Sequence, residues 1–134
     1  MLTIVFDTNI LFSGFGWRGS PYHCLQLARK GKVTSITCPE IMKELDDKLQ
    51  LKMKISPIDA LRATTEILLF SKLVTISNKL KVVIDDPDDD KILECAVIGN
   101  ADYIITGDHH LLSLVNYKDT AIVTSTDFLN LMLE

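Results

Sequence analysis

Short apolar runs alternate along the chain with longer segments in which apolar residues recur every three or four positions. The first run, residues 2–6, is apolar on both faces apart from Thr3, which is typical of a central strand in a parallel sheet. Further strands are predicted over residues 33–38, 73–77, 82–84, 103–106 and 121–123. Because helical segments separate most of these strands, we expect βα units that form a three-layer α/β/α sandwich around a central parallel sheet.

Proline and small polar residues mark the starts of the predicted helices. Pro21 follows a Ser20 cap and begins a helix that ends at Gly31, and three glycines predict a loop just before it, over residues 13–20. The other helices are predicted to begin at Pro39, at Pro57 behind a Ser56 cap, at Pro87, at residue 109 and behind a Ser125 cap. Crossovers between parallel strands are right-handed, so these helices should cover both faces of the sheet.

The 134 residues suffice for one domain with its own core, and no linker or repeat divides residues 1–134. The three cysteines are scattered without a C-x-x-C pair, which favours free buried thiols in a reducing cytosol. No basic leader precedes the first strand, and no apolar run approaches the length of a membrane span. We therefore expect a cytoplasmic protein with no membrane partner.

The formal net charge of −4 argues against binding of nucleic acid over the whole surface, although a local basic rim remains compatible with it. Much of the acidity lies in one run over residues 85–90. Four of its members are interpreted as helix-capping and solvated charge, namely Asp85, Asp86, Asp88 and Asp89.

Two predicted strands end in an aspartate. Asp7 follows the first strand directly, and Asp108 follows a later strand after one glycine. The carboxyl ends of parallel strands meet at one edge of the sheet, where the crossover helices begin. Asp90 stands in the first turn of such a helix and shares a face with Leu93 and Val97, which we expect to point inward. Carboxylates buried near one another need a cation to neutralise them, so this edge is predicted to bind a metal ion.

Carboxylate oxygens are hard ligands, and they favour Mg²⁺ or Mn²⁺. The chain lacks the cysteine and histidine spacing of a zinc site. A divalent ion held by carboxylates activates water and neutralises charge on a phosphate, so hydrolysis of a phosphodiester is the expected reaction. No side chain is an evident general base, which leaves activation of water to the metal.

At these residues the chain resembles the PIN-domain ribonucleases, over nearly its whole length. The similar features are Asp7-Thr8-Asn9-Ile10-Leu11 after an apolar strand, Glu44-Leu45 within the Pro39 helix, and the eighteen residues from Asp90 to Asp108. Segments 86–91, 101–103 and 106–108 are similar to a branch of small stand-alone bacterial and archaeal members that includes toxins. The resemblance implies a PIN-like variant of the Rossmann or flavodoxin-like topology.

The resemblance also implies a set of site residues. Its catalytic and metal-binding quartet is Asp7, Glu44, Asp90 and Asp108, with supporting hydrogen bonds from Asn9 and Thr106. From the residues alone, Glu44 is equally compatible with a solvated, salt-bridging helix face. Glu94, one turn after Asp90, is either an outer carboxylate of the site or a partner of Lys91.

Three residues near the same edge are candidates for substrate contact. Trp17 and Arg18 follow the first strand in a glycine-rich stretch, where they would stack on a base and hold a phosphate or simply anchor the loop. His109 follows Asp108, and it would contact phosphate when protonated or remain a surface histidine.

The leading hypothesis is a ribonuclease that depends on Mg²⁺ or Mn²⁺. Haloacid-dehalogenase phosphatases need a second aspartate where this chain has Asn9, and receiver domains need an acid pair and a lysine that it lacks. A catalytically degenerate PIN fold that binds RNA or protein is the alternative. The resemblance is compatible with a toxin inhibited by a small antitoxin, with an RNA-processing role, and with a homodimer.

Overall fold

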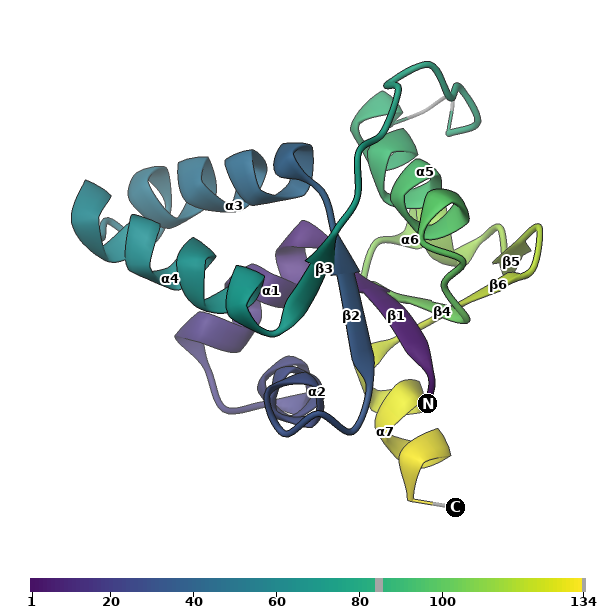
Figure 1. Cartoon of the computed structure of the whole chain (residues 1–134), viewed down its shortest axis with the longest axis horizontal. Coiled ribbons are helices and arrows are strands. Elements are labelled where there is room, and N and C mark those ends of the chain that lie inside the picture. The colour runs from purple at the N-terminus through teal and green to yellow at the C-terminus, as the bar shows by residue number, and fades with distance from the viewer. Residues whose placement is uncertain (84–85, 134) are drawn as a thin grey trace.

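The computed structural model describes residues 1–83 and 86–133, and a six-stranded sheet runs through it (Figure 1). The strands are β1 (Thr3–Phe6), β2 (Thr34–Thr37), β3 (Ser71–Leu73), β4 (Tyr103–Ile105), β5 (Asn116–Tyr117) and β6 (Thr120–Val123). Their order is β3-β2-β1-β4-β6-β5, and every pair is parallel except β5 with β6. The predicted parallel sheet is confirmed, with an additional antiparallel strand at one edge.

Helices cover both faces of this sheet in the described part of the chain. They are α1 (Thr8–Gly16), α2 (Ser20–Arg29), α3 (Pro39–Leu51), α4 (Pro57–Leu69), the 3₁₀ helix η1 (Pro87–Asp89), α5 (Asp90–Ile98), α6 (His109–Leu112) and α7 (Ser125–Met132). α2 and α7 pack together on one side of the sheet, while α5 contacts β1, β2 and β4 from the other (Figure 1). The predicted α/β/α sandwich is therefore confirmed. None of the described helices combines the length and apolar character that crossing a bilayer requires.

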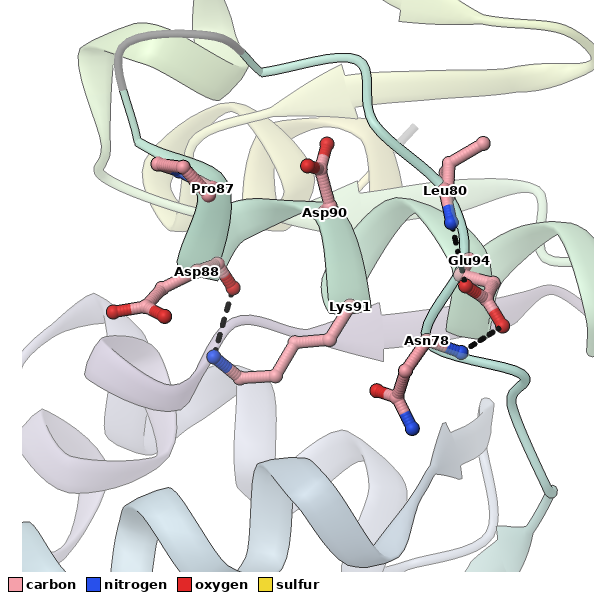
Figure 2. A pocket seen from close by; sticks show the side chains of 7 residues that line it. All are labelled: Asn78, Leu80, Pro87, Asp88, Asp90, Lys91 and Glu94. Carbon is pink, nitrogen blue, oxygen red and sulfur yellow. Dashed lines mark hydrogen bonds between the residues drawn. The ribbon is translucent and has the colours of Figure 1, made fainter.

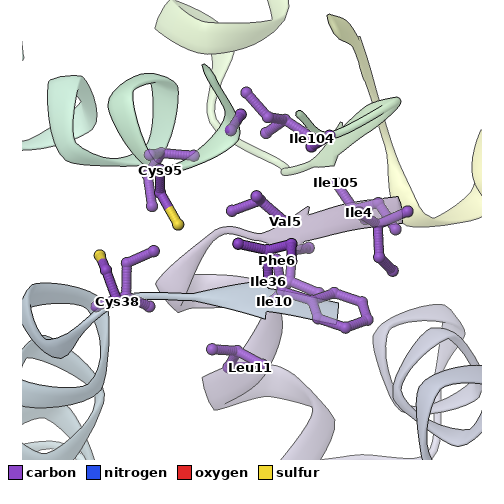
Figure 3. Close-up of a cluster of buried hydrophobic side chains, with 14 of the residues drawn as sticks. Ile4, Val5, Phe6, Ile10, Leu11, Ile36, Cys38, Cys95, Ile104 and Ile105 are labelled. Atoms are coloured by element: carbon purple, nitrogen blue, oxygen red, sulfur yellow. The ribbon is translucent and has the colours of Figure 1, made fainter. Parts of the chain in front are cut away.

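β1 lies at the centre of the sheet, between β2 and β4. Residues 4–6 are at most 2% exposed, and Val5 pairs with Ile36 on one side and Ile104 on the other (Figure 3). All three cysteines are free and buried, as the sequence predicted. Because β1 is central and buried on both faces, its packing fixes the position at which the next residue, Asp7, leaves the sheet.

Helix α1 occupies part of a segment that was predicted to be a loop. The prediction for residues 13–20 rested on three glycines, but the helix continues to Gly16. Gly14 has a packing role, because a Cβ atom there would overlap the side chain of Leu25 on α2. The glycine allows two helices to approach closely, and α1 can therefore begin immediately after Asp7.

Two helix N-caps show how closely the sequence predicted the starts of helices. Ser56 accepts a hydrogen bond from the Asp59 N–H at 3.1 Å, so the predicted cap of α4 is confirmed. The cap of the last helix is Thr124, whose hydroxyl accepts from the Asp127 N–H at 3.1 Å, and Ser125 is the first helical residue. The prediction for this helix start was one residue late.

Two predicted strands between α4 and α5 differ from the structure. The strand predicted over residues 73–77 overlaps β3 (Ser71–Leu73) only at Leu73, and residues 74–77 form no strand. Val82 and Val83 form no strand, because their N–H groups are bonded to a side chain of α5. The last residue of that second prediction, Ile84, lies outside the described residues.

Candidate metal centre

The strand order changes direction at β1, whose neighbours are β2 and β4, and Asp7 leaves the sheet at this point. Asp7 is 4% exposed, and its Oδ2 accepts a hydrogen bond of 2.6 Å from the hydroxyl of Thr106, which follows β4. The same Thr106 oxygen accepts the N–H of Asp108 at 3.0 Å. Thr106 thus joins the ends of the two strands and brings Asp7 and Asp108 to one edge, which is the usual location of sites in open α/β sheets.

Asp108 is the N-cap of α6. Its Oδ2 accepts the N–H of Leu111 at 3.1 Å, and the side chain is half-buried. This capping bond involves one carboxylate oxygen, so capping and metal contact are compatible for the same residue.

The third carboxylate at this edge belongs to Asp89. One oxygen each from Asp86, Asp89 and Asp108 lie within 4.8 Å of one another. Asp89 is 8% exposed, and its buried Oδ2 has no hydrogen-bond partner among the described residues. The interpretation of Asp89 as solvated charge is therefore wrong, whereas Asp88 is exposed as expected. Asp85 lies outside the described residues.

The carboxylates of this cluster perturb one another. Burial, reinforced by the neighbouring Asp108, Asp7 and Asp86, raises the pKa of Asp89 to about 8. Burial likewise raises the pKa of Asp7, against the opposing hydrogen bond from Thr106. Burial also disfavours the charged form of Asp108, but contacts with Asp89 and with the Leu111 N–H outweigh it and lower the pKa. Carboxylates that share a site without a counter-charge behave in this way.

Asp90 lies outside this cluster. Its Oδ1 accepts the N–H groups of Val82 and Val83, both at 2.8 Å, so the carboxylate holds the chain segment that crosses the start of α5. The structure brings Asp7, Asp108 and Asp89 into one region, whereas Asp90 is not among the carboxylates of the described cluster.

The sequence contained a signal for Asp89. Counting three, four and seven residues onward from Asp89 gives Ile92, Leu93 and Ala96, which are at most 1% exposed. The stripe chosen for Asp90 included Val97, which is only half-buried. Leu93 belongs to both stripes, and so the choice depended on the remaining positions.

Glu44 on α3 forms an ion pair with Lys91 on α5. The Lys91 Nζ lies 3.2 Å from Glu44 Oε2 and also donates to the backbone oxygen of Asp88 at 2.8 Å (Figure 2). Burial opposes ionisation of Glu44, but the Thr8 hydroxyl and the charges of Lys91 and Lys48 outweigh it and lower its pKa. The negative charge of Glu44 in turn helps to raise the pKa of Asp7, so Glu44 borders the cluster.

The two other predicted supporting residues bind elsewhere. Asn9 is exposed, and its Oδ1 accepts from Lys48 Nζ at 2.7 Å. Glu94 accepts the N–H groups of Ser77, Asn78 and Leu80, so it is neither an outer carboxylate of the cluster nor a partner of Lys91 in this structure. Lys48 and Lys91 were missed as site residues, because the position of Lys48 depends on how α3 packs against α1 and that of Lys91 on how α3 packs against α5.

The candidate substrate residues have local partners. Trp17 is 63% exposed, with its ring centroid 6.3 Å from that of Phe12. The Arg18 guanidinium lies 5.5 Å from the ring of Tyr22. The exposed His109 stacks on His110 at 4.0 Å. These contacts leave the proposed roles in RNA binding untested.

The chemistry of the acidic cluster fits a hard divalent cation. Its closest three members offer only carboxylate oxygens, as Mg²⁺ and Mn²⁺ prefer. A buried oxygen without a hydrogen-bond donor is costly, and a cation would remove both this deficit and the repulsion between the carboxylates. The described cluster is therefore compatible with metal binding.

Comparison with known proteins gives a match at the level of a family. A family model described as the PIN domain matches residues 3–110, a span that contains β1 through β4 and every acidic residue of the cluster. A comparison with curated proteins found no match.

Proposed function

The chain belongs to the PIN-domain family, whose members are generally metal-dependent nucleases, and from that premise we propose that it is a divalent-metal-dependent ribonuclease. Asp7, Asp89 and Asp108 would hold the ion, with Asp86 and Glu44 at its border. This assignment keeps three of the four residues of the predicted quartet and replaces Asp90 with Asp89.

The observation that carries the proposal is the unpartnered, buried Asp89 oxygen at the centre of the acidic cluster. A carboxylate kept solely as a helix cap would accept a backbone N–H, as Asp108 does, and Asp89 makes no side-chain capping bond. Its burial beside Asp86 and Asp108 is explained if a cation neutralises the group.

The side chains have separable roles in this proposal. Thr106 orients Asp7 through the 2.6 Å hydrogen bond, and the Leu111 N–H orients Asp108. Lys91 keeps Glu44 ionised at the border of the site. When bound, a divalent ion would supply activation of water and neutralisation of charge on the phosphate.

Mg²⁺ and Mn²⁺ are both part of the proposal, because either accepts an all-oxygen ligand set. The toxin role, a small protein antitoxin, a homodimer and a cytoplasmic location rest on the resemblance to small stand-alone family members. An antitoxin gene beside this one, whose product abolishes the nuclease activity, would support the toxin role.

The direct test is cleavage of single-stranded RNA by purified protein with Mn²⁺ or Mg²⁺. We expect Asp89→Asn to reduce the rate about a hundredfold or more, because it removes a charged ligand. Asp88→Asn is the matched control, since Asp88 is the exposed neighbour, and we expect a rate within about twofold of the wild type. Absence of cleavage by the wild type, with Mn²⁺ still raising the melting temperature, would instead favour the degenerate binding module.

A further inference from the structure

The segment that crosses the start of α5, residues 77–83, is held by an unusual set of contacts; we refer to it as the strap. Glu94 accepts the N–H and hydroxyl of Ser77, the latter at 2.9 Å, and the N–H groups of Asn78 and Leu80 at 3.1 and 3.3 Å. Figure 2 shows the strap passing over α5, with the bonds from Asn78 and Leu80 to Glu94. One buried carboxylate thus fixes the first half of the strap.

Asp90 fixes the second half through Val82 and Val83. The two carboxylates, both at most 8% exposed, together accept six hydrogen bonds from the strap. Two buried negative charges are a costly means of attaching a loop, since apolar side chains would cover α5 without desolvating a charge. Their presence indicates that the position of the strap matters.

The strap presents positive charge at its outer side. Lys79 and Lys81 are exposed, while Leu80 between them packs on the core, as expected for an extended segment with alternating side chains. Residues 71–83 contain no acidic residue in a chain of net charge −4. The strap is therefore a local basic rim of the kind that a polyanion requires on an acidic protein.

The rim lies next to the acidic cluster. Lys81, Val83, Pro87 and Asp90 line one cavity, so Lys81 stands at the start of α5, where Asp89 ends η1. The nearer lysines are engaged with the protein: Lys91 with Glu44 and Lys48 with Asn9. Lys79 and Lys81 are therefore the exposed cations that the strap offers to a phosphate near the start of α5.

We propose that Lys79 and Lys81 bind the backbone phosphates of single-stranded RNA, and that Asp90 and Glu94 are positioning residues that hold the strap in place for this contact. The inference rests on the proposed ribonuclease function and adds the surface along which its substrate lies. It also gives Asp90 and Glu94 a role that does not involve the metal.

The first test measures binding of a fluorescent single-stranded RNA in EDTA, where cleavage cannot interfere. We expect the K79A/K81A double variant to bind about tenfold more weakly, with the salt dependence of log K reduced by about 1.4 for two lost phosphate contacts. The matched control is K30A/K32A, which removes two exposed lysines just before β2, at the other edge of the sheet, and should leave both quantities unchanged. An unchanged Mn²⁺-induced rise in melting temperature would show that K79A/K81A leaves the metal site intact.

The second test addresses positioning. Glu94→Gln places an amide NH₂ among N–H donors, because both Glu94 oxygens accept from the strap, and Asp90→Asn removes the charge that strengthens the bonds from Val82 and Val83. Hydrogen exchange of residues 77–83 should therefore accelerate in both variants. RNA affinity should fall in each variant, and adding K79A/K81A should weaken binding little further, because the losses share one cause. If Glu94→Gln does not fold, Asp90→Asn provides the same comparison.

The results separate this inference from the proposed function. Equal RNA affinity and salt dependence for K79A/K81A and K30A/K32A would overturn the inference even if Mn²⁺-dependent cleavage is observed. If the losses of RNA affinity caused by Asp90→Asn and by K79A/K81A were fully additive, the positioning role of Asp90 would be overturned. Lysine-dependent RNA binding without cleavage would support the rim while rejecting the nuclease assignment.

Discussion

Asp89 and Asp90 are adjacent in sequence at the start of α5, and yet their carboxylates have different partners. Asp89 faces Asp86 and Asp108 with an unpartnered buried oxygen, whereas Asp90 accepts two backbone N–H groups at 2.8 Å from Val82 and Val83. A helix turns by about 100° per residue, so consecutive side chains diverge at once. A buried oxygen of Asp89 lacks a donor, whereas one oxygen of Asp90 accepts two, which makes their mutants informative as a pair.

The first prediction concerns the stability of these two mutants. Asp90→Asn should lower the free energy of unfolding by about 2 kcal/mol, because the two hydrogen bonds that Oδ1 accepts lose their charge assistance. Asp89→Asn should leave metal-free protein as stable as the wild type or more so, since it removes a repelled, buried charge. Urea unfolding in EDTA measures both. A strong loss in Asp89→Asn, with none in Asp90→Asn, would contradict the assignment.

Adding Mn²⁺ should reverse the order of stability of Asp89→Asn and Asp90→Asn. The wild type and Asp90→Asn should gain melting temperature with Mn²⁺, whereas Asp89→Asn should not, because stabilisation by a ligand requires its site. Asp88→Asn serves as control, since its exposed side chain should leave the gain unchanged.

The second prediction concerns the pH dependence of the metal-free protein. The pKa of Asp89 is raised to about 8, so its contribution to stability is fully present below the unfolded carboxyl pKa and is lost as pH rises through about 8. Asp7 shifts in the same direction. The free energy of unfolding in EDTA should therefore fall by about 2 kcal/mol from pH 6 to pH 8. Asp89→Asn should flatten this dependence, and an equally steep decline in the mutant would contradict it.

The third prediction tests the hydrogen bond between Thr106 and Asp7. Thr106→Val removes the 2.6 Å bond and should weaken Mn²⁺ binding about tenfold, because the bond orients Asp7 and favours its charged form. Thr106→Ser keeps the hydroxyl and should restore most of the affinity. Calorimetric titration with Mn²⁺ measures this directly.

A matched threonine separates metal affinity from general stability. Thr120 is also buried, and its hydroxyl donates to the Ala101 oxygen at 2.8 Å, away from the acidic cluster. Thr120→Val should lower stability to a similar extent while leaving Mn²⁺ affinity unchanged. Equal losses of affinity in the two valine variants would indicate a general effect of destabilisation.

The sequence sufficed to place Asp7 and Asp108, because both follow strands whose carboxyl ends must meet in a parallel sheet. It did not suffice to choose between Asp89 and Asp90. The strap covers Asp90 and Glu94, so both are buried as deeply as Asp89, and no single apolar stripe marks the inward face of α5. That cover depends on contacts between residues up to seventeen positions apart, which helical periodicity does not reveal.

α1 was missed for a related reason. Glycine lowers helix propensity, so Gly14 and Gly16 predicted a loop, but the contact between Gly14 and Leu25 outweighs the local preference. Tertiary packing also determines the ion pair of Glu44 with Lys91, which joins residues forty-seven positions apart. Strand ends were thus predictable from local pattern, whereas contacts between helices were not.

The last prediction follows from that ion pair, which ties α3 to α5 beside the acidic cluster. Lys91→Met should lower the free energy of unfolding by about 2 kcal/mol, because it leaves the half-buried Glu44 carboxylate without its partner. The same change should tighten Mn²⁺ binding, since it removes a positive charge close to the acids. A lower melting temperature in EDTA with a larger gain on adding Mn²⁺ is therefore expected. Lys43→Met is the control, because Lys43 pairs with the exposed Asp47 and its loss should change neither quantity appreciably. If Lys91→Met weakened Mn²⁺ binding, Lys91 would be supporting the metal ligands rather than competing with the ion for Glu44.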